Sequence, residues 1–112
     1  MNDFQTKLKL KMDGYVHLVY KISRKFPKDE LYGVTSQLRR AAMSVILNYI
    51  EGYARQSCKD QKHFYKISYA SLAETKYLIH FSLSEKYMGQ NDYKLAYDLS
   101  NEIGAMLWKC MK

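Results

Sequence analysis

Residues that interrupt helices are scarce in this sequence. Its 112 residues include one proline and five glycines. Proline and glycine destabilise a helix interior more than any other residue, so their scarcity favours long helices. A chain of this length has the size of a single domain and can bury a modest core without disulfides or a structural metal. We therefore expect one domain, residues 1–112, that is rich in helix.

Long apolar runs are absent as well. No segment approaches the roughly 20 apolar residues that a membrane-spanning helix needs, and the first residues lack the apolar core of a secretory signal. Cysteine is rare, and the spacing of Cys58 and Cys110 is not that of a metal site. We expect a cytoplasmic protein that does not bind a membrane and whose cysteines stay reduced.

Motifs for catalysis and metal binding are also missing. His17, His63 and His80 have no paired ligand spacing, so surface or interface positions are the simpler interpretation. No serine lies in a nucleophile elbow, and no glycine-rich loop could hold phosphate. The segment 74–77 begins with Glu74 but lacks the histidine of the Glu-x-x-His motif in di-metal bundles. We expect no cofactor, no metal and no enzymatic activity.

Apolar residues recur at helical spacing in four segments. The predicted helices cover residues 3–25, about 28–53 with Gly33 splitting off a short first turn, 58–88 after a capping Ser57, and 92–112. Short loops between long helices predict an all-α, antiparallel up-down-up-down four-helix bundle. The predicted core positions are Phe4, Leu8, Met12, Tyr15, Val19, Ile22, Phe26, Val34, Leu38, Ala41, Val45, Asn48, Gly52, Phe64, Ile67, Ser71, Glu74, Leu78, Phe81, Ala96, Leu99, Ile103, Met106 and Cys110.

Several polar residues fall on or beside these apolar strips, where they need partners. A hairpin with its midpoint near Gln56 brings Glu74 within one helical turn of Arg39 and Arg40. We therefore expect a buried carboxylate that pairs with one of these arginines; an isolated acid with a raised pKa is the alternative. The predicted buried polar residues are Arg39, Arg40, Asn48, Glu51, Ser71 and Glu74.

The second and third predicted helices carry more apolar surface than one core requires. The additional strips consist of Ile46, Tyr49, Ile50, Tyr53, Leu72, Ile79 and Leu83. Left exposed, they would form a large apolar patch, which cyclic symmetry between copies could bury. These positions are the predicted interface of a homo-oligomer.

Positive charge is the remaining feature, with a net charge of +7. The bundle topology gathers nine basic residues at the end that holds both termini, against the acids Asp3, Glu51 and Asp60. The predicted contacts with RNA or DNA phosphates are Lys7, Lys9, Lys11, Arg55, Lys59, Lys62 and Lys66, with Lys109 and Lys112 beside them. A solvated basic rim on a structural homo-oligomer that binds only a protein partner is the alternative. The eleven tyrosines could stack on bases, but at helical spacing they are more typical of a core or an interface.

Several motifs together carry a family resemblance. They are Phe26-Pro27, the run from Glu30 to Ala42, Ser44, Asn48, Glu51-Gly52 and Ser71-Leu72-Ala73-Glu74. With these in register over nearly the whole chain, the sequence resembles the four helix bundle proteins first noticed as products of intervening sequences in bacterial 23S rRNA genes. The resemblance implies a bundle that assembles into a ring-shaped homopentamer, of no established enzyme activity. The family is also similar in fold to accessory proteins of diversity-generating retroelements, which bind a reverse transcriptase and nucleic acid.

This chain departs from the family pattern at one position. The family usually has a proline after Ser-Ile, where this chain has Ser44-Val45-Ile46-Leu47. Because proline is what would bend the helix there, we expect this helix to run without a kink.

Overall fold

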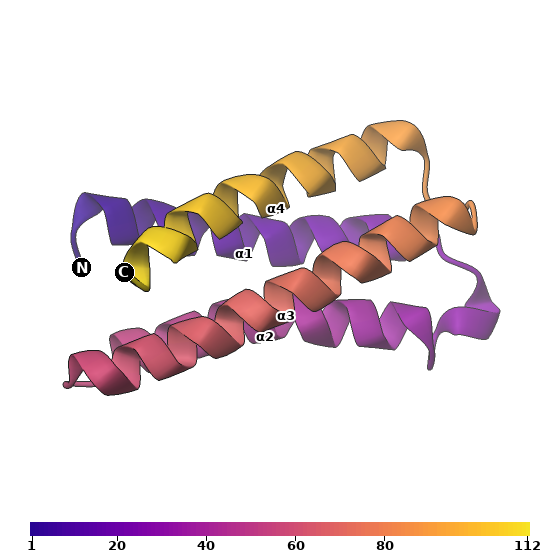
Figure 1. Cartoon of the computed structure of the whole chain (residues 1–112). Helices are drawn as coiled ribbons and strands as arrows, with labels where there is room; N and C mark the ends of the chain where they lie inside the picture. Colours follow the sequence, from indigo (N-terminus) through magenta and orange to yellow (C-terminus); the bar gives the residue numbers. More distant parts are fainter.

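The protein is described from a computed structural model that covers residues 1–112. The elements are α1 (Asp3–Ser23), the 3-10 turn η1 (Lys28–Glu30), α2 (Val34–Tyr53), α3 (Cys58–Ser84) and α4 (Gln90–Cys110). Successive helices run in opposite directions, so both termini and the α2–α3 loop lie at one end of the molecule, which we call the terminal end (Figure 1). The predicted all-α four-helix bundle is confirmed, and α2 is one uninterrupted helix.

Local sequence explains where the helices begin. The side chain of Asn2 accepts a hydrogen bond from the backbone N–H of Gln5 at 2.8 Å, which caps α1. Ser57 caps α3 in the predicted way, since its Oγ accepts from the N–H of Asp60 at 3.1 Å. These side chains supply the acceptors that the first turn of a helix lacks.

The ends of the helices differ from prediction by a few residues. The first helix stops at Ser23 rather than at residue 25. The third stops at Ser84 rather than at residue 88, because Lys86 takes a left-handed conformation with φ of 64°. That conformation cannot continue a right-handed helix. The fourth starts at Gln90 with Gly89 as its cap residue, slightly earlier than expected.

The helices α2 and α3 approach each other closely along small residues. Ser68 Oγ donates to the backbone carbonyl of Val45 at 2.6 Å, and the hydroxyls of Ser44 and Ser71 lie 2.7 Å apart. At Gly52 an added Cβ would lie 2.7 Å from the ring of Tyr65. Hydroxyls in this contact satisfy their hydrogen bonds within the helix pair, so the core tolerates them.

The core runs the length of the bundle. It confirms the predicted apolar strip of the first helix except at Phe4, which is half-buried. On α3 the predicted strip is wrong, because only Leu78 of its six positions is buried. The buried face lies about one residue further round the helix and consists of Tyr65, Ser68, Leu72, Thr75, Leu78, Ile79 and Ser82. The hydroxyls on this face have hydrogen-bond acceptors, Val45 O for Ser68 and carbonyls of α3 itself for Thr75 and Ser82. On α4, Ala96 and Ile103 are buried as expected, and Leu99, Met106 and Cys110 are half-buried.

This rotation of α3 overturns the predicted buried ion pair. Glu74 and Arg40 are both exposed, and neither forms an ion pair within the chain. The predicted alignment of α2 with α3 along the bundle was close to correct. Ser44 lies opposite Ser71, which places Glu74 opposite Ala41, the residue after Arg40. Its side chain points away from the core, however. Glu51 is likewise exposed, and it pairs with Arg55 one turn later.

The other predicted buried polar residues are half-buried and have partners inside the chain. Arg39 donates through Nε to Ser23 Oγ at 2.8 Å. Asn48 donates to the backbone carbonyl and the hydroxyl of Ser44, both at 2.9 Å, and Ser71 bonds to Ser44 as above. The bond of Arg39 joins α2 to α1, the bond of Ser71 joins α3 to α2, and the bonds of Asn48 lie within α2.

The predicted oligomer interface needs a correction too. Ile46, Tyr49, Leu72 and Ile79 belong to the core of the single chain and cannot contact another copy. Ile50 is exposed, and Tyr53 and Leu83 are half-buried. The large apolar and aromatic side chains that remain exposed on α2 and α3 are Leu47, Ile50, Ile67, Tyr69 and Tyr77. None of the helices is long and apolar enough to cross a membrane.

Candidate nucleic-acid interface

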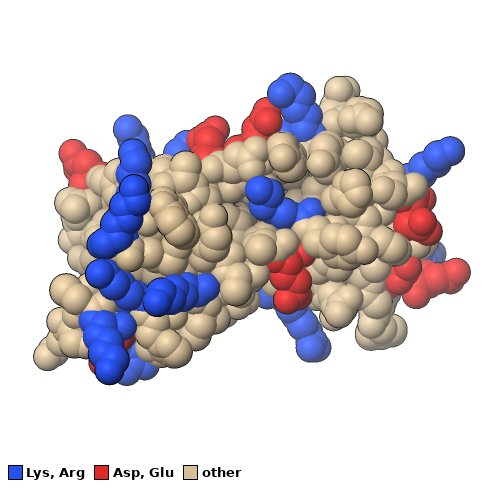
Figure 2. All heavy atoms as spheres, viewed as in Figure 1, with Lys and Arg blue, Asp and Glu red and all other residues tan.

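Basic side chains gather at the terminal end. Figure 2 shows lysines and arginines crowded at that end of the visible face, while acids lie mainly along the top and at the opposite end. The start of α1 contributes Lys7 and Lys9, and the first turns of α3 contribute Lys59 and Lys62. Lys66 follows one turn later, and it lines a hollow together with Lys112 of the C-terminus. The fold thus brings basic residues from both halves of the sequence to one end.

Two of the predicted phosphate contacts are already paired. Lys11 Nζ lies 2.6 Å from a carboxylate oxygen of Glu102, and Arg55 pairs with Glu51. Glu102 belongs to α4 and was not counted among the acids of this end. The other five, Lys7, Lys9, Lys59, Lys62 and Lys66, form no ion pair. Their charge is free to act on a ligand in solution.

Arg55 has a mainly structural environment. Its guanidinium lies 4.7 Å from the centre of the Phe64 ring. Its backbone carbonyl accepts a hydrogen bond from the side chain of Gln61 at 3.0 Å. Together with the pair to Glu51, these contacts fix the turn between α2 and α3. The lysines that follow this turn are therefore held on a well-defined part of the chain.

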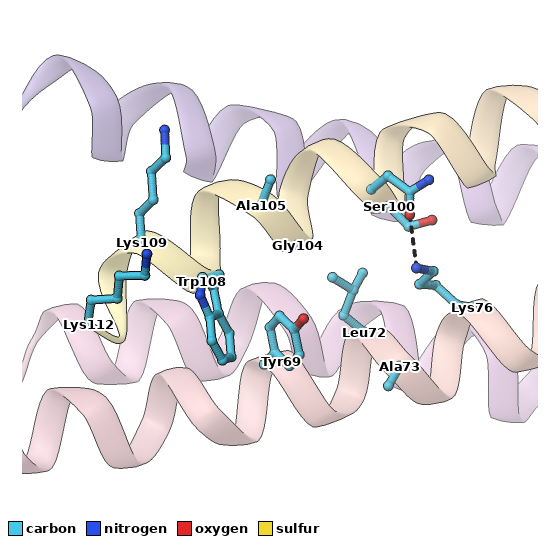
Figure 3. Close-up of a pocket in the computed structure, with 11 residues that line it drawn as sticks. Tyr69, Leu72, Ala73, Lys76, Ser100, Gly104, Ala105, Trp108, Lys109 and Lys112 are labelled. Carbon is cyan, nitrogen blue, oxygen red and sulfur yellow. Dashed lines mark hydrogen bonds between the residues drawn. The ribbon is translucent and has the colours of Figure 1, made fainter.

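A groove between α3 and α4 opens toward this end. It has a volume of about 520 Å³, and its walls include Tyr69, Leu72, Gly104 and Trp108 (Figure 3). A second hollow of about 220 Å³ shares Tyr69, Trp108 and Lys112 with the first, so the two are adjacent. The rings of Tyr69 and Trp108 lie 5.7 Å apart at an angle of 51°. We call this feature the aromatic groove.

A different hollow lies beside α1 and α2 around Arg39 and Arg40. The guanidinium of Arg39 lies 4.7 Å from the centre of the Tyr20 ring, besides its hydrogen bond to Ser23. No carboxylate of the chain pairs with either arginine. The hollow is a second basic surface, away from the terminal end.

Burial perturbs a small group of residues near the terminal end. The pKa of the Cys110 thiol is raised by burial. Burial and the nearby Cys110 also raise the pKa of Tyr49 and Tyr65, whose rings stack 5.3 Å apart. Raised pKa values keep these groups neutral at physiological pH, so they act as packing residues. No three His, Cys, Asp or Glu side chains converge on a point that could hold a metal ion.

Sequence reasoning missed the aromatic groove. Neither Tyr69 nor Trp108 was among the predicted site residues. The sequence signal for this groove is Trp108, the single tryptophan of the chain. It lies outside the predicted apolar strip of α4 and is followed by Lys109 and Lys112. An indole at a surface position beside basic residues is typical of binding surfaces.

The protein is therefore an all-α bundle of four antiparallel helices, with one basic end and no cluster of metal-ligating side chains. The family described as 23S rRNA-intervening sequence protein matches residues 7–109. The chain belongs to this family, as the sequence motifs had indicated. No curated protein matches the chain.

A solved structure supports the same fold. It is the crystal structure of a protein with unknown function from the S23 ribosomal protein family of Bacteroides thetaiotaomicron. The TM-score is 0.89 with 18% sequence identity, and the match covers 96% of this chain and 97% of the other. At this identity the likeness concerns the fold.

Proposed function

We propose that this protein is a non-enzymatic, oligomeric module that binds RNA or DNA through the phosphates at its terminal end. The observation that carries the proposal is the set of five unpaired lysines, Lys7, Lys9, Lys59, Lys62 and Lys66, gathered there by the fold. Unpaired lysines on one end of a molecule attract a polyanion and release its counterions on contact. Such contacts position a nucleic acid without reading its sequence.

Oligomerisation would strengthen this binding. Copies related by a ring symmetry present the same end on one face, so their fields add. The exposed apolar side chains Leu47, Ile50 and Ile67 supply surface for contacts between copies. The resemblance suggests five copies, and it suggests a role as an accessory of a nucleic-acid enzyme.

The test reverses charge at the terminal end and compares it with a matched change at the other end. The variant Lys7→Glu, Lys9→Glu, Lys59→Glu changes three exposed, unpaired lysines. The control Lys21→Glu, Lys25→Glu, Lys28→Glu makes the same charge change on three exposed lysines from the last turn of α1 to the start of η1. Binding of labelled RNA and DNA is measured by fluorescence anisotropy over a range of salt concentrations.

We expect the terminal-end variant to lose affinity for both nucleic acids, and the control to stay close to the parent. The slope of log K against log salt should fall by about one for each phosphate contact removed, hence by about three. Equal losses in the two variants would show that net charge alone matters. Absence of binding by the parent at low salt would favour the alternative, a structural homo-oligomer that binds only a protein partner.

A further inference from the structure

The aromatic groove exposes the only tryptophan of the chain. Trp108 is 51% exposed on α4, and Tyr69 is 37% exposed on the facing side of α3. Figure 3 shows the indole extending from α4 toward α3, with the Tyr69 ring beside it. Two neighbouring aromatic faces open to solvent are a surface on which a flat ring can stack.

Small residues keep this groove open. At Gly104 of α4, a Cβ would come within 3.4 Å of Leu72 Cδ2, so a larger side chain there would fill the floor. Ala73 and Ala105 line the same stretch without projecting into it. The second hollow adjoins the groove at Tyr69 and Trp108 and is also lined by Lys66 and Met111. It therefore connects the aromatic pair with the lysines of the terminal end.

The charge around the groove has one sign. Lys66, Lys109 and Lys112 line it and form no ion pair, and no aspartate or glutamate lines either hollow. At its far end Lys76 is positioned by the side chain of Asn101, to which it donates at 2.9 Å (Figure 3). Stacking faces surrounded by unpaired ammonium groups complement a ligand with flat rings on an anionic backbone.

We propose that the aromatic groove binds an unpaired base of a single-stranded nucleic acid, stacked on Trp108 beside Tyr69. Phosphates on either side of this base then lie near Lys66, Lys109 and Lys112. This proposal rests on the proposed function and adds that the protein prefers single strands, because the bases of a duplex are stacked within the helix and cannot enter the groove.

The single tryptophan supplies a direct test, because all indole fluorescence comes from Trp108. The protein is titrated with a short oligouridylate, with a duplex of equal length and with an abasic oligonucleotide of equal length. Stacking of a base on the indole should quench the fluorescence with the oligouridylate only. The oligouridylate should also bind more tightly than the abasic strand.

Variants separate stacking from charge. Trp108→Ala should weaken oligouridylate binding by roughly 5- to 150-fold, which is the range for loss of one base–aromatic contact. Trp108→Phe should retain most of the affinity because it keeps an aromatic face. Tyr77→Ala removes another exposed aromatic side chain from α3, outside the groove, and should bind like the parent.

Three results would overturn the proposal while leaving phosphate binding at the terminal end intact. They are unchanged fluorescence when oligouridylate binds, equal affinity of Trp108→Ala and the parent, and equal affinity for duplex and single strand. A change in oligomer mass of Trp108→Ala, with unchanged affinity per subunit, would also overturn it, because the groove would then be a contact between copies. Failure of the parent to bind any of the three nucleic acids would overturn both proposals.

Discussion

Gly52 and Gly14 both lie inside helices, but their surroundings differ. A Cβ at residue 52 would lie 2.7 Å from the Tyr65 ring and 3.0 Å from the backbone carbonyl of Gln61. At residue 14 nothing lies within 4 Å. The first glycine is therefore required by the close approach of α2 and α3, and the second is not required by packing.

Alanine at these two positions should have opposite effects. Gly52→Ala should destabilise the protein by about 1–3 kcal/mol, because the forced shift outweighs the gain in helix propensity. Gly14→Ala should stabilise it by about 0.5–1 kcal/mol, because alanine favours the helix and restricts the unfolded chain. Urea unfolding followed by circular dichroism measures both. Destabilisation by Gly14→Ala would indicate that another copy packs against this part of α1.

The two cysteines are both free, and they differ in exposure. Cys58 is exposed at the start of α3, whereas burial raises the pKa of Cys110 at the end of α4. Because the thiolate is the reactive form, a raised pKa shifts the reaction of Cys110 to higher pH than that of an ordinary thiol.

A thiol reagent should therefore modify Cys58 first. At neutral pH we expect one fast and one slow phase, with the slow phase accelerating as the pH rises above the range of an ordinary thiol. The fast phase should disappear in Cys58→Ser and persist in Cys110→Ser. Mass spectrometry of each phase identifies the modified residue, and a fast phase on Cys110 would show that its site opens readily.

At the scale of elements, the contact between α2 and α3 includes buried hydroxyls beside the apolar side chains. Ser68 shows this most clearly, since it is fully buried and its hydroxyl donates to the carbonyl of Val45 across the pair. Thr75 and Ser82 satisfy their hydroxyls on carbonyls of their own helix. Small side chains with internal hydrogen bonds allow the two backbones to come close.

Two substitutions of Ser68 separate its hydrogen bond from its size. Ser68→Ala should cost about 0.5–1.5 kcal/mol, the usual value of one hydrogen bond. Ser68→Val should cost more, about 1–3 kcal/mol, because the extra methyl groups have no space. Ala70→Val, at an exposed position of α3, controls for the lower helix propensity of valine. If Ser68→Val lowers the free energy of unfolding no more than Ser68→Ala does, α2 and α3 leave enough space for the extra methyl groups.

At the scale of the whole molecule, the exposed outer face of α2 and α3 is the surface best suited to contacts between copies. Leu47 is 56% exposed and Ile50 is 38% exposed on α2. Ser44 and Ser71 face each other across the antiparallel pair. Ile67 of α3, one turn before Ser71, therefore lies level with Asn48 of α2, one turn after Ser44. The three exposed apolar side chains therefore lie at nearly the same level along the bundle.

We expect a homo-oligomer in solution and a smaller particle when this face is made polar. Leu47→Gln combined with Ile67→Gln should lower the mass measured by light scattering at micromolar concentration, without loss of helical signal. Leu95→Gln removes a comparably exposed leucine from α4 and should leave the mass unchanged. A parent protein with the mass of one chain would contradict the expectation.

The sequence by itself determined the helices, their order and the family. Few helix breakers, the cap at Ser57 and the 3-4 spacing of α1 are local signals, and short loops leave one simple way to connect four helices. The same topology placed the lysines of residues 7–11 and 55–66 at one end. These features follow from chain connectivity, so they could be predicted without knowing any side-chain contact.

Only the tertiary structure decided which face of α3 is buried. On α3 hydropathy favoured a strip through Glu74, whereas the close approach of α2 selects the neighbouring face with Ser68, Thr75 and Ser82. Because the buried face lies about one residue further round α3 than predicted, Glu74 is at the surface and Leu72 and Ile79 are in the core. The aromatic groove arises in the same way, from Tyr69 and Trp108 on helices that are distant in sequence. Hydrogen bonds between helices and steric fit decide such choices, and neither is encoded in the spacing of residues along one helix.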